Sequence, residues 1–227
     1  MSVRLSTPSD ERPRKRLSAS QRRELIERAA SEVFSERGYR AATIDEIARR
    51  SGVSAPVVYD HFDSKLDLHR RLLERYYGEL RGVWRENLAG EEPGDVRIAR
   101  SFDAWFGYLQ AHPYAWRMLF ADTTGDREIE ALHRAVAAES RDAIIDLLAR
   151  EAGVATTGPG GAVALEMVWE LVRCALQGLA LWWYDHRDVP REQVVAAAMN
   201  VLWVGFERTG RGERWLPQHV RHEGRAD

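Results

Sequence analysis

The stretch SGVSAPVVYDHFDSK, residues 51–65, places a short apolar segment between two turn signals. Gly52 permits a sharp turn, and Ser54 followed by Pro56 is typical of a helix start, because proline is tolerated in the first turn of a helix. The outward positions of this helix carry Ala, Pro, Val, Tyr and His, which is too apolar for an ordinary solvent face. The pattern predicts a surface helix that contacts another molecule. Its core-facing positions are expected to be Val53, Val58 and Phe62.

The residues just before this stretch predict a second short helix. Thr43-Ile-Asp-Glu46 has the form of a capping box, and Ile44, Ile47 and Ala48 form an apolar face behind it. Two short helices joined by a turn of about three residues form a helix-turn-helix unit, whose second helix lies in the major groove of DNA. The sequence therefore predicts a recognition helix at residues 54–62.

Helical patterns continue on both sides of this unit. From Ser20 onward apolar residues recur on one side of a helix that Gly38 is expected to end. Ser64 is placed to cap a longer helix that runs to about Leu88.

Residues from about 20 to 68 resemble the N-terminal domain of the TetR/AcrR family of transcriptional regulators. The matching features are the Phe34–Gly38–Tyr39 corner, Thr43-Ile-x-x-Ile-Ala, Gly52-Val53-Ser54 and Tyr59-x-His61-Phe62-x-x-Lys65. Two positions depart from the family pattern, since Val57 replaces a common Ser or Thr and Asp60 is acidic. The base preference therefore stays open.

The resemblance implies a DNA-binding surface. Thr43, Tyr59 and His61 are expected to meet phosphates, with Lys65 adding positive charge, and small apolar groups of the recognition helix are expected to pack on thymine methyls. No Arg, Asn or Gln occupies these positions, so specificity is expected to depend on DNA shape and on an arm at residues 12–16 that enters a minor groove. The alternative is that this arm is a solvated tail. The predicted DNA-binding residues are Thr43, Ser54, Ala55, Pro56, Val57, Tyr59, His61 and Lys65.

Composition limits the remaining possibilities. Residues 1–70 hold 14 Lys/Arg against 11 Asp/Glu, and residues 71–227 hold 19 against 24, so a basic N-terminal part precedes an acidic remainder, unless the difference arises by chance. The single cysteine, Cys174, is typical of a reducing compartment. No apolar stretch is long enough for a signal peptide or a membrane span. We expect a cytoplasmic protein that contacts no membrane and needs no cofactor.

The larger C-terminal part predicts further helices at about 96–111, 114–120, 126–152, 162–185 and 191–208. The resemblance implies that this part binds a small molecule and that its last two helices pair with a second copy as a four-helix interface. Six of the eight tryptophans lie there, and Trp169, Arg173 and Gln177 share one helix face. The alternative is a plain core in which Arg173 pairs with Glu170 or Glu166. The predicted effector-binding residues are Trp84, Phe102, Trp105, Phe106, Trp116, Trp169, Arg173 and Gln177.

We therefore predict an all-α protein with four parts. These are a disordered basic arm (1–19), a three-helix helix-turn-helix domain (20–68), a helical ligand-binding and dimerisation domain (69–210) and a flexible tail (211–227). Its predicted function is that of a homodimeric repressor released from a palindromic double-stranded DNA operator by a small, largely apolar effector.

The sequence leaves two alternative functional classes. A helical scaffold or small-molecule-binding protein without DNA activity would leave the pattern of residues 43–65 unexplained. A metal-dependent enzyme has one supporting feature, because Glu130 and His133 form a Glu-x-x-His half-motif of di-iron bundles. A second copy of this half-motif is absent from the sequence, so we predict neither a metal site nor catalytic residues.

Overall fold

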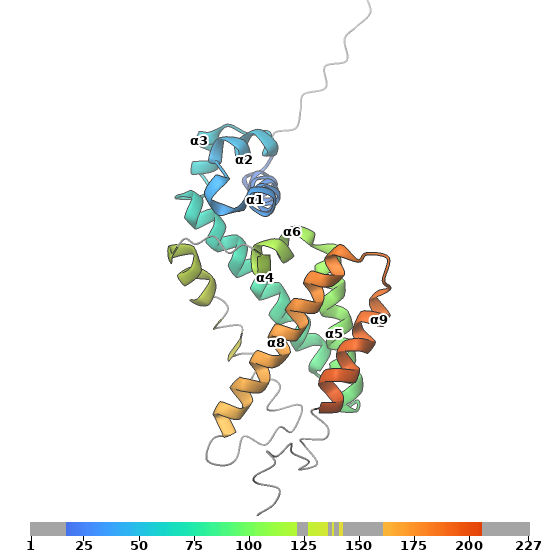
Figure 1. Cartoon of the computed structure of the whole chain (residues 1–227). Helices are drawn as coiled ribbons and strands as arrows, with labels where there is room; N and C mark the ends of the chain where they lie inside the picture. The colour runs from blue at the N-terminus through green and yellow to red at the C-terminus, as the bar shows by residue number, and fades with distance from the viewer. Residues whose placement is uncertain (1–16, 122–126, 136–137, 139–140, 143–160, 206–227) are drawn as a thin grey trace, which may run out of the picture.

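The computed structural model describes residues 17–121, 127–135, 138, 141–142 and 161–205. Within these ranges every regular element is a helix, which confirms the predicted all-α class (Figure 1). Three helices form a compact group at the N-terminal end, and α4 leads from this group into the larger helical part. Residues 1–16 of the predicted arm (1–19) and the predicted tail at 211–227 lie outside the described residues, and the last residue of the predicted arm, Ala19, belongs to the first helix.

The first helix, α1, spans Ala19–Ala41 and starts one residue before the predicted position. Ser18 explains this early start, because its side chain accepts a hydrogen bond from the Gln21 N–H at 3.1 Å while the Gln21 side chain accepts one from the Ser18 N–H at 2.9 Å. Near the other end Gly38 adopts a φ of 71°, which breaks the helix at the predicted residue.

The helix-turn-helix unit consists of α2 (Ile44–Ser51) and α3 (Ala55–Tyr59). Thr43 caps α2 through a hydrogen bond that its hydroxyl accepts from the Glu46 N–H at 3.2 Å. The Glu46 carboxylate binds Arg37 at 3.0 Å and Arg50 at 3.2 Å. Of the predicted capping box, the structure therefore shows the hydrogen bond to the Thr43 side chain. Gly52 ends α2 with a φ of 72°, the left-handed conformation that the tight turn requires.

The fourth helix, α4 (Lys65–Leu88), packs along α5 (Gly94–Ala111). The chain then returns to α1 through α6 (Pro113–Trp116) and the π-helical turn η1 (Arg117–Ala121). The predicted single helices at 114–120 and 191–208 thus both contain π-helical turns, since α9 (Arg191–Ala198) continues into η2 (Met199–Trp203). Before it comes α8 (Gly161–Asp185), and the described residues of 127–142 are helical.

The middle of α4 is joined to α1 by polar contacts. A hydroxyl–hydroxyl hydrogen bond of 2.5 Å links Ser31 with Tyr76, and Arg75 pairs with Glu27 at 2.7 Å. Each buried neutral hydrogen bond adds about 0.5–1.5 kcal/mol to stability. The predicted domain boundary at residue 68 falls inside α4, so one continuous helix serves both parts of the molecule.

Candidate functional site

The surface of α3 is held by two buried anchors. Val58 and Phe62 are fully buried under α3, as predicted, whereas Val53 is half-buried. Tyr59 is 54% exposed, so its ring extends from the protein instead of filling the core. Of the other predicted DNA-binding side chains, Thr43, Ser54 and Pro56 are exposed, and Ala55, Val57 and His61 are half-buried.

Lys65 has a structural role that the sequence did not reveal. Its ammonium group donates hydrogen bonds to the carbonyls of Tyr39 at 2.9 Å and Ala42 at 3.0 Å, and it lies 4.4 Å from the centre of the Tyr39 ring. A cation at the C-terminal end of a helix stabilises the unpaired carbonyls there. Lys65 therefore fastens the first turn of α4 to the end of α1, and its predicted contact with phosphate remains a prediction.

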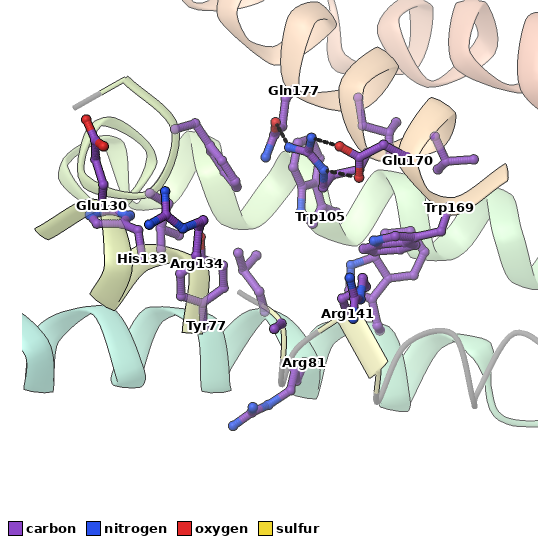
Figure 2. A pocket seen from close by; sticks show the side chains of 18 of the residues that line it. Tyr77, Arg81, Trp105, Glu130, His133, Arg134, Arg141, Trp169, Glu170 and Gln177 are labelled. Carbon is purple, nitrogen blue, oxygen red and sulfur yellow. Dashed lines mark hydrogen bonds and ion pairs between the residues drawn. The ribbon is translucent and has the colours of Figure 1, made fainter. Parts of the chain in front are cut away.

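A large cavity lies in the second part of the molecule. It has a volume of about 750 Å³ and lies between α4, α5, η1, the 127–141 segment and α8 (Figure 2). Its walls combine aromatic and aliphatic side chains with a few polar groups, which is the usual composition of a small-molecule site. The residues that line it include Tyr77, Arg81, Trp84, Trp105, Leu119, Glu130, His133, Arg134, Arg141, Trp169, Glu170, Arg173, Leu176 and Gln177.

The polar side of this cavity is organised around Arg173. Its guanidinium donates two hydrogen bonds to the Glu170 carboxylate and one to Gln177 Oε1 at 2.6 Å (Figure 2). The hydrogen bond to Glu170 raises the pKa of Arg173, and the same bond lowers the pKa of Glu170. Burial raises the pKa of Tyr77 to about 12, against the opposing effect of Arg173. Arg173, Glu170 and Tyr77 therefore keep their usual charge states near neutral pH.

The charges around the cavity are unequal. Four arginines line it (Arg81, Arg134, Arg141 and Arg173), against two carboxylates, Glu130 and Glu170. Glu170 is paired with Arg173, and Arg141 is paired at 2.9 Å with Asp142, which is not a lining residue, so arginines still outnumber carboxylates on the cavity wall. A ligand with an apolar body and an anionic group matches this arrangement.

An apolar stripe on α8 lies outside the cavity. Met167 and Leu171 are 59% and 69% exposed, and the small residues Ala175 and Gly178 continue the same face as exposed positions. Further along, Leu181 and Trp182 are about half exposed, and on η2 Val201 is 74% exposed. Such a contiguous exposed apolar face is typical of a protein–protein interface.

Comparison with known proteins connects these features. Residues 26–72 match the family model described as "Bacterial regulatory proteins, tetR family", and residues 95–205 match "Tetracyclin repressor-like, C-terminal domain". The chain is also 30% identical over 192 residues to the HTH-type transcriptional activator FasR of Mycolicibacterium smegmatis, covering 84% of this chain and 85% of FasR. This chain belongs to the TetR family of transcriptional regulators.

Two further proteins are similar to this TetR-family chain, one in sequence and one in structure. The HTH-type transcriptional repressor KstR2 of Rhodococcus jostii is 38% identical over 71 residues, which is 31% of this chain and 34% of KstR2. The crystal structure of FadR from Bacillus subtilis in complex with stearoyl-CoA superposes with a TM-score of 0.65 at 17% identity, covering 80% of this chain and 96% of FadR. At that identity the likeness shows a shared fold.

Five of the eight predicted effector-binding residues lie on the cavity wall of this TetR-family protein: Trp84, Trp105, Trp169, Arg173 and Gln177. The alternative pairing of Arg173 with Glu170 is also present, so both interpretations of that helix face describe part of the structure.

The other three predicted residues are corrected by the structure. Phe102 lies behind Trp84, edge-on at 6.0 Å, and Phe106 is enclosed between Trp105 and Trp183 at 5.0 and 5.7 Å. Trp116 stacks on Tyr184 at 4.9 Å, away from the cavity. All three rings are buried in the core, because aromatic content alone does not say which ring faces a cavity and which fills volume behind it.

Several cavity residues were missed at the sequence level. Tyr77 and Arg81 on α4 precede the predicted Trp84 by seven and three residues, a helical spacing that could have indicated both. Leu119 offers no such signal, because it lies in a π-helical turn where the usual spacing fails.

The Glu130–His133 pair also lines the cavity. Across the part of the chain that the structure describes, no group of three or more His, Cys, Asp or Glu side chains is arranged to hold a metal ion. In the same residues, no helix is both long enough and apolar enough to cross a membrane.

Proposed function

We propose that this TetR-family protein is a homodimeric repressor that binds a palindromic operator and is released when a small, largely apolar effector enters the cavity. One observation carries this proposal. The single helix α4 is fastened to the helix-turn-helix domain by Lys65 at its first residue, and it contributes Tyr77, Arg81 and Trp84 to the cavity wall. A ligand that repositions α4 therefore also repositions α3.

The exposed stripe of α8 supports the homodimer. A two-fold interface uses the same patch on both copies, and the stripe supplies large apolar side chains beside small ones that allow close approach. A dimer places two recognition helices on successive major grooves, roughly 34–36 Å apart. Leu171→Glu puts a charge into this interface, so we expect a monomer by light scattering, whereas the exposed Glu86→Ala on α4 keeps the dimer.

The cavity supports an amphiphilic effector. Its apolar walls suit a hydrocarbon body, and the excess of arginines suits an acidic head such as a carboxylate or phosphate. The FadR structure that shares this fold contains stearoyl-CoA, which has both features. Stearate and stearoyl-CoA are therefore the first probes, because they share the acyl chain and differ in the head group.

The repressor assignment depends on release. FasR, a relative that matches over 84% of this chain, is an activator, and KstR2 is a repressor. We assign repression because ligand and operator are expected to oppose each other reciprocally, with a coupling of about 1–3 kcal/mol.

The test begins with selection of binding sites from a random duplex pool. We expect a palindromic site whose affinity falls steeply with salt, because several phosphates are neutralised. Titrating stearate and then stearoyl-CoA into that complex should weaken it. Arg134→Ala should reduce the effect of a probe whose anionic head group pairs with Arg134.

Each part of the proposal has a contrary outcome. Absence of any enriched site would support the scaffold interpretation. An enriched site whose affinity rises with the probe, together with higher reporter output, would replace repression by activation.

A further inference from the structure

An imidazole is buried where an apolar side chain would cost less. His69, on α4, is fully buried, and neither of its ring nitrogens has a hydrogen-bond partner among the residues that the structure describes. A buried polar group without a hydrogen-bond partner destabilises the folded state, because its hydration is lost and not replaced. Burial, with smaller effects of His133 and Lys65, lowers the pKa of His69 to about 3, so the ring is neutral at ordinary pH. Stability alone therefore does not account for a histidine at this place.

The ring lies between the two functional parts of the molecule. On one side it meets two rings of α1, Phe34 edge-on at 4.8 Å and Tyr39 at 5.0 Å. On the other side it meets His133 at 5.8 Å, and His133 lines the effector cavity (Figure 2). His69 is thus in contact with the cavity wall and with the core of the DNA-binding domain at once.

The contacts continue from Tyr39 to the start of α2. The Tyr39 ring contacts the Lys65 ammonium, and this ammonium donates to the carbonyls of Tyr39 and Ala42. Ala42 directly precedes Thr43, the N-cap of α2 and a predicted phosphate contact. Because these groups are close-packed, a displacement of His69 cannot be absorbed locally without moving the corner between α1 and α2.

We propose that His69 is a positioning residue that couples the cavity to the helix-turn-helix unit. Effector binding displaces His133, the displaced ring shifts His69, and His69 shifts the Tyr39–Ala42 corner that sets the orientation of α2. This inference rests on the proposed function, since it specifies how occupancy of the cavity reaches the DNA-binding surface. It assigns His69 a role in transmission and no direct contact with effector or DNA.

A double-mutant cycle on operator affinity, without effector, tests the contact directly. His133→Leu should change the operator Kd about fivefold in the wild-type background and less than twofold in the His69→Leu background, because residues in one contact network are not additive. Leu132→Ala is the matched control, because Leu132 lies on the same segment, is half-buried and is not a cavity-lining residue. It should have the same effect in both backgrounds. Equal effects of His133→Leu in the two backgrounds would overturn the proposal.

A second arm uses stearoyl-CoA. If it weakens wild-type operator binding about tenfold, His69→Leu should reduce that factor below about threefold, while the Kd for stearoyl-CoA without DNA changes less than twofold. A coupling factor that stays at about tenfold contradicts the role of His69. If stearoyl-CoA and stearate leave wild-type operator binding unchanged, acyl effectors are wrong for the proposed function, and the double-mutant cycle still decides on His69.

The proposal also stays testable if His69→Leu does not fold. His69→Met is the second variant, because its flexible side chain fills irregular space. With His69 itself unchanged, its ring ¹⁵N resonances should differ between the wild-type protein and His133→Leu. Unchanged resonances would contradict the coupling.

Discussion

The DNA-binding region and the cavity region of this protein differ in how far apart their residues lie in the sequence. The predicted DNA-binding residues lie between Thr43 and Lys65, on two short helices and the turns beside them. The cavity collects side chains from Tyr77 to Gln177, on elements that meet only after folding. The first region is close-packed around Val58 and Phe62, whereas the second leaves about 750 Å³ unfilled.

The two functions place different demands on packing, and therefore on stability. A DNA-binding surface needs side chains held at a fixed spacing to match the groove, so its core is filled and its helix ends are capped. An effector site needs space, so its wall residues give up some of the packing energy that a filled core would supply.

The largest contrast is expected for the same substitution in the two regions. Leu72→Ala, in the filled core of α1 and α4, should lower the free energy of unfolding by about 3–5 kcal/mol, because a new cavity adds to the lost burial. Leu176→Ala, on the cavity wall, should cost only about 2 kcal/mol, because space already lies beside it. Urea unfolding at one fixed protein concentration measures both, and equal losses would contradict the contrast.

The second contrast concerns pH, at the boundary between the two regions. Since burial lowers the pKa of His69 from 6.5 to about 3, the unfolded chain binds a proton that the folded chain excludes. Stability from this group is complete above pH 6.5 and falls as pH decreases toward 3, by about 1.4 kcal/mol at pH 5.5. His69→Leu should remove that part of the pH dependence. Parallel curves of unfolding free energy against pH for the two proteins would refute it.

A third contrast compares two glycines that have open space around the position of an added Cβ. Gly52, in the turn before α3, has a φ of 72°, so Gly52→Ala should cost about 1 kcal/mol through backbone strain. Gly82, inside α4, has an ordinary helical conformation, so Gly82→Ala should stabilise the protein by about 0.5–1 kcal/mol. Thermal unfolding should show shifts of opposite sign, and a shared sign would argue against the turn geometry.

The smallest contrast concerns two tyrosine hydroxyls. Tyr59→Phe removes a hydroxyl from the exposed face of α3 and should weaken operator binding roughly threefold to tenfold, the value of one hydrogen bond to a charged phosphate partly replaced by water. Tyr77→Phe, in the cavity wall, should leave operator affinity without effector unchanged. Fluorescence anisotropy with a labelled operator measures both. If Tyr59→Phe binds as tightly as wild type, Tyr59 makes no phosphate contact.

The sequence predicted local features well. The positions of Gly38 and Gly52 as helix ends, the cap residues Thr43 and Ser64, and the buried pair Val58 and Phe62 all appear in the structure. These features depend on interactions between residues a few positions apart, and such interactions are encoded in the spacing itself.

The cavity was only partly predictable, because its residues lie far apart in the sequence. Trp84 and Trp105 were expected at the wall and are found there, but Phe102 and Phe106 lie one layer further back. Phe102, Trp105 and Phe106 belong to one apolar pattern on α5, and only the rotation of α5 against α4 decides which of them faces the cavity. Helix periodicity indicates which face is buried, and it does not indicate what that face meets.

The sequence by itself determined the all-α fold and the helix-turn-helix unit, because capping, turn chemistry and periodicity act over short distances along the chain, and its resemblance to known sequences indicated the TetR family. Only the tertiary structure decided that Lys65 fastens α4 to α1, that the cavity wall carries four arginines, and that His69 lies between His133 and Tyr39. These contacts join residues far apart in the sequence. Their geometry is set by how whole helices pack, which no local pattern specifies.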